Sequence, residues 1–135
     1  MHVKKSLTLA EARQIAAAAE AEAAKNQWNV TIAILDEGGH LLYLERMDDA
    51  PLGGVVVAQE KARTAVLFRR PTKSIEESVL GGRLVMLALP GATPIEGGLP
   101  LLNSERVVGG IGVSGVQSAQ DAQIARAGVE VAARL

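Results

Sequence analysis

Apolar residues recur every three or four positions near the start of the chain, at Leu9, Ala12, Ala16, Ala19 and Ala23. This spacing places them on one face and predicts a helix over about residues 9–25. Thr8, with Glu11 three positions later, is a capping-box pattern that starts the helix, and Asn26 is a suitable C-cap. The first predicted element is therefore an amphipathic helix.

Two runs of β-branched and apolar residues follow, at residues 30–35 and 41–44. They flank a Gly-containing turn at residues 36–39, and this combination predicts a β-hairpin. A second helix is predicted over about residues 55–68, and Pro71 stops it because proline cannot continue a helix.

The next stretch of the chain carries shorter elements. Ser74 and Glu77 form another capping-box pattern, which opens a third helix that the pair Gly81-Gly82 interrupts. Prolines and glycines mark turns between residues 89 and 100, with one short strand expected at Thr93–Glu96.

A last strand is expected over residues 106–113, followed by a final helix capped by Ser118 and Asp121. The predicted order is α-β-β-α-α-β-β-α. Hairpins between neighbouring strands favour an antiparallel sheet with helices packed against it, rather than a parallel βαβ array. We therefore expect a single α+β domain over residues 1–135.

Composition restricts the core to small side chains. Hydrophobic residues make up 48% of the 135 positions, yet the chain has one Phe, one Trp and one Tyr. Ala, Val, Leu and Ile must build the core, and each buries less apolar area than an aromatic ring. A core of this kind gains stability at a subunit interface, so we expect a homo-oligomer.

Charge and residue content exclude several classes of function. Fourteen Lys and Arg oppose fifteen Asp and Glu, with no basic stripe and few aromatics, so no nucleic-acid partner is expected. No apolar run approaches the roughly 20 residues of a membrane span, and the N-terminus has no signal-peptide pattern. Cysteine is absent, which excludes disulfides and thiol chemistry. The expected location is cytoplasmic.

Residues 110–115, Gly-Ile-Gly-Val-Ser-Gly, match the dinucleotide-binding pattern G-x-G-x-x-G. That pattern needs a further parallel strand with an acidic residue about 20 positions on, whereas the chain reaches Leu135 there. A dinucleotide site is therefore not expected. Two interpretations remain: a tight strand-to-helix turn, or a turn whose free amides bind an anion such as a carboxylate.

Two polar or flexible segments are candidates for a binding site. Arg46, Asp48 and Asp49 follow the second hairpin strand, where they can act on a ligand or form a surface ion pair. Residues 97–100, Gly-Gly-Leu-Pro, can line a pocket or merely reverse the chain. Lys61 belongs to the second predicted helix, whose cations are expected to be mostly solvated.

The two histidines give no metal-binding or triad pattern. His2 lies near the chain start, His40 lies at the hairpin turn, and neither belongs to an H-x-x-x-H or H-E-x-x-H spacing. No metal site is expected. His40 is either a plain turn residue or, if haem binds, an axial ligand, because one exposed imidazole suffices for that role.

Several segments together resemble those of one known family. They are Val30–Asp36 with Gly38-Gly39, Glu45-Arg46-Met47-Asp48, Lys61-Ala62-Arg63-Thr64-Ala65 with Phe68, Pro71-Thr72, Gly97-Gly98-Leu99-Pro100-Leu101, and residues 107–115 with Asp121. In order and spacing they resemble the GlcG/HbpS-like family, also called the haem-degrading or PduO C-terminal-like domain, across about 120 residues.

The resemblance implies a profilin-like three-layer α/β/α domain with a central antiparallel sheet. It also implies homo-oligomers, octamers or smaller, with ligand sites near subunit contacts. Family members include haem-binding proteins, domains fused to corrinoid adenosyltransferases, and proteins of catabolic gene clusters such as glycolate use. Fold transfers along such a resemblance better than function does.

Departures limit what the resemblance implies. The chain shows no adenosyltransferase domain, so corrinoid adenosylation is not expected. Asp49 stands where the family usually has a small residue, and residues 103–106, Asn-Ser-Glu-Arg, stand where it usually has a Gly pair. The resemblance assigns no axial haem ligand to any residue of this sequence.

Three functional hypotheses follow. The first is a homo-oligomer that binds haem or another carboxylate-bearing cofactor, with Arg46 or Lys61 meeting the carboxylate. In this hypothesis Gly97, Gly98 and Pro100 line the pocket. The second is an accessory enzyme of small organic acid catabolism, with Asp48 as general base. The third is a structural oligomer with no ligand.

Overall fold

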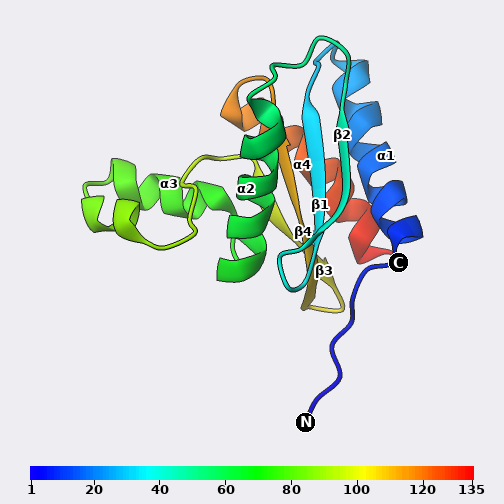
Figure 1. Ribbon diagram of the computed structural model, residues 1–135, viewed down its shortest axis with the longest axis horizontal. Coiled ribbons are helices and arrows are strands. Elements are labelled where there is room, and N and C mark those ends of the chain that lie inside the picture. The colour runs from blue at the N-terminus through cyan, green and yellow to red at the C-terminus, as the bar shows by residue number, and fades with distance from the viewer.

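Four antiparallel strands form the centre of the structure, a computed structural model that describes residues 1–135 (Figure 1). The sheet order is β2-β1-β4-β3. Its strands are β1 (Thr31–Asp36), β2 (Leu41–Arg46), β3 (Gly98–Asn103) and β4 (Arg106–Ser114). The expected α+β class with an antiparallel sheet is confirmed.

Helices cover both faces of this sheet, which gives three layers (Figure 1). Helices α1 (Leu9–Lys25) and α4 (Ser118–Ala133) pack together on one face, and α2 (Gly54–Phe68) covers the other. Helix α3 (Thr72–Leu80) and the 3-10 helix η1 (Leu84–Ala88) extend away from the sheet beside α2. None of the helices combines the length and apolar character that a membrane span requires.

Alternation along β1 divides the core into two parts. Ile32 and Ile34 belong to the larger apolar cluster, with residues of α1 and α4. Ala33 and Leu35 point to the opposite face and pack against α2. Successive strand residues face opposite sides of a sheet, so β1 serves both layers.

Glycines of β4 bring α2 unusually close to the sheet. A Cβ built on Gly112 would lie 1.9 Å from the carbonyl oxygen of Ala58 and 2.6 Å from the amide nitrogen of Ala62. A Cβ on Gly110 would lie 2.6 Å from the carbonyl oxygen of Ala62. Gly110 and Gly112, the first two glycines of the G-x-G-x-x-G match, therefore serve helix packing in an antiparallel sheet, not a dinucleotide turn.

The predicted first helix and hairpin are confirmed. Thr8 and Glu11 form the expected capping box, and Asn26 is the C-cap of α1. The prediction of a strand at Thr93–Glu96 is wrong, because β3 begins at Gly98, two residues after the predicted strand ends. Pro100 is tolerated within β3 because this strand lies at the edge of the sheet, where one side of its backbone needs no partner strand.

Two predicted helix caps are also wrong. Helix α3 begins at Thr72 rather than Ser74, whose hydroxyl donates to the carbonyl oxygen of Pro71. Helix α4 is capped by Gln117 with Gln120, not by Ser118 with Asp121. The Asp121 carboxylate has other partners, described below.

Candidate functional site

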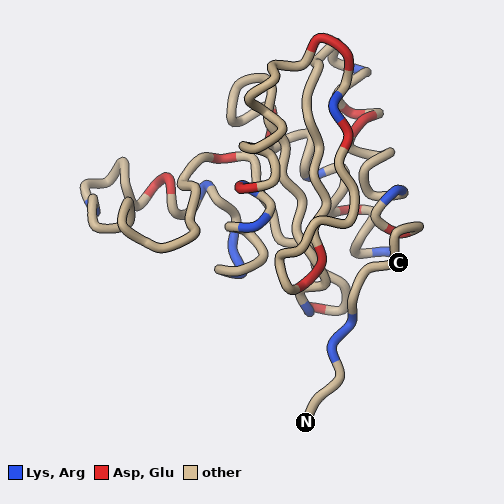
Figure 2. The backbone as a smooth tube through the Cα atoms, in the orientation of Figure 1, with Lys and Arg blue, Asp and Glu red and all other residues tan.

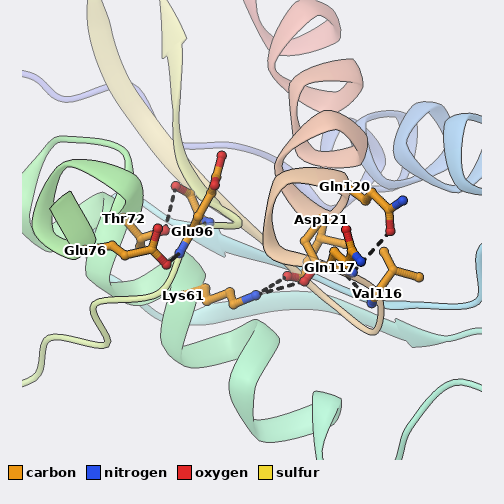
Figure 3. Close-up of polar contacts among 10 residues, drawn as sticks. Lys61, Thr72, Glu76, Glu96, Val116, Gln117, Gln120 and Asp121 are labelled. Atoms are coloured by element: carbon orange, nitrogen blue, oxygen red, sulfur yellow. Dashed lines mark hydrogen bonds and ion pairs between the residues drawn. The ribbon is translucent and has the colours of Figure 1, made fainter. Parts of the chain in front are cut away.

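A buried ion pair connects the two helical layers (Figure 3). The ammonium of Lys61, on α2, lies 3.1 Å from Oδ2 of Asp121, in the first turn of α4. Its second partner is the carbonyl oxygen of Val113, 3.0 Å away. The side chains of Lys61 and Asp121 are only 2% and 3% exposed. The expectation of a solvated cation is therefore wrong for Lys61, whose helix position faces the sheet.

Burial controls the protonation of Asp121. Loss of water around the carboxyl raises its pKa, and this effect exceeds the opposing attraction of the Lys61 ammonium and the hydrogen bond from the Val116 amide. Glu96 raises the pKa slightly further. The pair is thus held together at a cost in desolvation.

The turn at Gly97-Gly98 packs directly on this ion pair. Gly97 has φ of +132°, and a Cβ there would lie 2.7 Å from Nζ of Lys61. A Cβ on Gly98 would lie 2.2 Å from the carbonyl oxygen of Lys61. The amide of Gly98 donates to the hydroxyl of Thr72 at 2.9 Å. Only glycine fits at these two positions, and contacts with Lys61 and Thr72 fix the position of the turn.

A cleft of about 170 Å³ lies against the outer side of this turn. It is lined by Pro71, Lys73, Glu96, Gly97, Gly98, Leu99, Ala122 and Arg126. Lys73 lies 3.9 Å from Glu96, whereas no carboxylate lies within 4 Å of the Arg126 guanidinium. Arg126 is exposed and is thus the unpaired cation of the cleft.

The structure places Arg46 and Asp48 elsewhere on the same end of the sheet. Arg46 pairs with Thr31, which pairs in turn with Ser114, so Arg46 lies two strands from β4. With strands about 4.8 Å apart, that separation is about 10 Å. The ammonium of Lys61 is buried and bonded to Asp121, whereas Arg46 is exposed on β2, so the two cations do not present themselves to one ligand group within the chain.

Arg46 and Asp48 share a second, shallower depression of about 410 Å³ with acidic neighbours. Its lining residues are Glu20, Asn29, Glu45, Arg46, Met47, Asp48 and Asp49. Burial, and then the nearby Glu20 carboxylate, raise the pKa of Glu45. A carboxyl that retains its proton more readily than usual lies beside the candidate base Asp48.

His40 lies at the far end of β1 from Arg46, in the β1–β2 turn. Its backbone amide donates to Oδ1 of Asp36 at 2.9 Å, and its side chain is exposed. Pro100 is half-buried on β3, two residues beyond Gly98. The role of His40 as an axial ligand stays a prediction, separate in space from the glycine turn.

Sequence reasoning missed Arg126 and the role of Asp121. One signal was available: Lys61 lies at helical spacing with the buried Ala58 and Ala65, so it shares their apolar face. Asp121 likewise adjoins the buried Ala122. A lone charge on each of two buried faces indicates that the two charges pair with each other.

Comparison with known proteins identifies the family. The family described as haem degrading protein HbpS-like matches residues 7–130. The chain belongs to the HbpS-like family. This HbpS-like chain is 47% identical over 114 residues to protein GlcG of Escherichia coli strain K12, covering 84% of the chain and 85% of GlcG.

Solved structures agree with the family assignment. Protein ORFY of Klebsiella pneumoniae matches with a TM-score of 0.91 at 30% identity, over 100% of this chain and 96% of ORFY. A double mutant of HbpS from Streptomyces reticuli matches at 0.88 and 33%, over 97% and 90%. A structure described as a PduOC:heme complex matches at 0.84 and 28%, over 93% and 94%.

Proposed function

We propose that the chain binds a carboxylate-bearing cofactor, with haem the first candidate, at the cleft over Gly97-Gly98. The observation that carries the proposal is the unpaired guanidinium of Arg126 beside a glycine turn that packs on a buried ion pair. Guanidinium binds a carboxylate through two parallel hydrogen bonds. A rigid turn keeps the opposite wall of the cleft in place, which lowers the entropy lost on binding.

The relatives support haem as the ligand. The PduOC structure contains heme, and the family description refers to haem degradation. Both statements concern those proteins, and the proposal extends them to this chain. In it, Arg126 meets a propionate, while Lys61 holds the turn in position without touching the ligand.

The size of the cleft leads to a proposal about assembly. Its volume of about 170 Å³ is below the roughly 300 Å³ of a typical enclosed ligand site. We propose that a second copy of the chain covers the rest of the ligand, in a homo-oligomer of eight or fewer subunits. Exposed apolar side chains on α3 and η1 support this assembly, namely Leu80, Leu84, Val85 and Leu87.

The assembly proposal predicts a smaller particle after substitution in η1. The double variant Leu84→Glu with Leu87→Glu places two carboxylates on this apolar surface, where burial against another copy would leave them unpaired. Light scattering should report a multiple of 14.1 kDa for the original chain and a lower multiple for the variant. Val3→Glu, on the exposed N-terminal tail, is the control and should leave the mass unchanged. A monomeric original chain would contradict the proposal.

The function itself is tested by titrating the purified protein with haemin and following absorbance. We expect a saturable Soret shift at about one haem per subunit or fewer, with albumin as the comparison for loose binding. Absence of a shift, or a shift that never saturates, would contradict the haem proposal. If His40 ligates the iron, His40→Ala should alter the bound spectrum; an unchanged spectrum excludes that role.

One observation favours a second candidate, the accessory enzyme. Glu45, whose pKa is raised by burial, shares one depression with Asp48 and Arg46, and general acid–base chemistry on an organic acid uses carboxyl groups grouped in this way. Under this proposal Asp48→Asn abolishes turnover of the acid but leaves haemin binding unchanged.

A further inference from the structure

A second cavity lies at the opposite end of the sheet from the glycine-turn cleft. It has a volume of about 400 Å³ and is bounded by the N-terminal tail, the C-terminal end of α2, the β1–β2 turn and the β3–β4 hairpin. Figure 2 shows the basic part of the tail near the charged tip of that hairpin. This cavity shares no lining residue with the cleft over Gly97-Gly98.

Cations dominate the charged lining of this cavity. Its charged side chains are Lys4, Lys5, Arg69, Arg106, Glu37 and Glu105. The four cations exceed the two carboxylates by two charges, although the whole chain has a net charge of −1. None of these six side chains forms an ion pair within 4 Å. A small molecule with two negative charges would balance the cavity.

Glu37 adds a requirement for a donor. Its Oε2 atom is buried and accepts no hydrogen bond. A buried acceptor without a donor is uncommon, because its lost hydration is then not replaced. Glu37 also lines the cavity, so its carboxylate can accept a hydrogen bond from a group bound there. A ligand hydroxyl would supply such a donor.

Two of the five non-glycine residues with a positive φ line the same cavity. Arg69 has φ of +54° at the C-cap of α2, a position where glycine is usual, and Glu105 has φ of +65° in the β3–β4 turn. Residues with side chains rarely adopt this left-handed conformation. Arginine at position 69 is less stable in this conformation than glycine would be, but it places a guanidinium at the cavity wall. Strained residues of this kind cluster at binding sites.

We propose that this cavity binds a small dianion that carries a hydroxyl group, either a hydroxydicarboxylate or a phosphate monoester. The guanidinium groups of Arg69 and Arg106 bind the anionic groups, and the lysines of the tail close over them. Glu37 accepts from the hydroxyl. The site is independent of the haem proposal, since either can fail without the other.

Isothermal titration calorimetry with four probes tests the site. Malate and glycerol 3-phosphate represent the two sources of a hydroxyl-bearing dianion, and succinate and methyl phosphate are their hydroxyl-free counterparts. We expect one hydroxylated probe to saturate and to bind at least about 10-fold more tightly than its counterpart, since a buried acceptor selects for its donor. Binding should weaken when salt rises from about 0.05 M to about 0.5 M. No saturable binding, or equal binding within both pairs, would overturn the proposal.

Variants separate binding from folding. Arg69→Gly relieves the left-handed strain, so it should melt no lower than the original chain, and combined with Arg106→Ala it should weaken binding about 30-fold or more. Glu37→Ala should abolish the preference for the hydroxylated probe while retaining affinity for its counterpart. Arg13→Ala, on the exposed side of α1, is the matched control and should leave the melting temperature and the affinity for the probes unchanged. Undiminished affinity in the Arg69→Gly, Arg106→Ala variant would show that these two arginines do not bind the anionic groups of the ligand.

Discussion

Lys61→Met is expected to lower the free energy of unfolding by about 3–5 kcal/mol near neutral pH. The substitution fills the space of the lysine stem but leaves the Asp121 carboxylate, 3% exposed, without its ammonium partner. It also removes the donor to the carbonyl oxygen of Val113. Chemical denaturation followed by circular dichroism measures the effect.

The loss should depend on pH in a defined direction. The pKa of Asp121 is raised in the folded chain, so its folded form binds a proton more tightly than the unfolded chain does. The corresponding stability is fully present below the unfolded pKa and is lost as pH rises through the folded pKa. Removing Lys61 raises that pKa further, so the variant should lose less stability at about pH 4 than at about pH 8.

A matched control and a double variant complete this test. Lys25→Met removes a 71% exposed lysine from a surface pair and should change stability by less than about 0.5 kcal/mol. Lys61→Met combined with Asp121→Leu removes both charges and should recover much of the loss. A small and pH-independent effect of Lys61→Met would mean that the ion pair does not hold the two layers together.

Gly112→Ala is expected to lower the free energy of unfolding by about 3 kcal/mol or more. The added methyl group would lie 1.9 Å from the carbonyl oxygen of Ala58, a backbone atom that cannot move without shifting α2 from the sheet. Thermal unfolding followed by circular dichroism, or chemical denaturation, measures the change.

Gly53→Ala provides the control for this prediction. Gly53 precedes α2 directly, has φ of −62°, and has no atom within 4 Å of a built Cβ. Its backbone is already in the right-handed helical region, which alanine adopts without strain, so the substitution should lower stability by no more than about 0.5 kcal/mol. Similar losses for Gly53→Ala and Gly112→Ala would show that close packing of α2 on β4 is not what requires glycine.

Local pattern was sufficient for much of the fold. The capping box at Thr8 and Glu11 and the turn between β1 and β2 depend on neighbours in sequence, so the sequence shows them directly. The location of β3 depends instead on pairing with β4 and on the contact of Gly98 with Lys61. Pro100 masked this strand, because proline is excluded from a strand interior but allowed at an edge.

The candidate site was harder to derive. Gly97 and Gly98 were identified from their flexibility and from the family resemblance, but Thr72, the hydrogen-bond partner of Gly98, lies 26 positions earlier in the sequence. Arg126 carried no signal of its own, since an exposed arginine on a helix resembles any solvated charge. Its position beside the glycine turn follows only from the packing of α4 across β3.

The most direct test of the central claim is the haemin affinity of Arg126→Ala combined with Lys73→Ala. If the cleft over Gly97-Gly98 holds a propionate, losing both cations should weaken binding about 10- to 100-fold, as expected for charge-assisted hydrogen bonds. Arg13→Ala combined with Lys25→Ala, on the exposed surface of α1, should bind as the original chain does. Equal haemin affinity in the two double variants would contradict the proposed site, because haem would then bind without using the cations of the cleft.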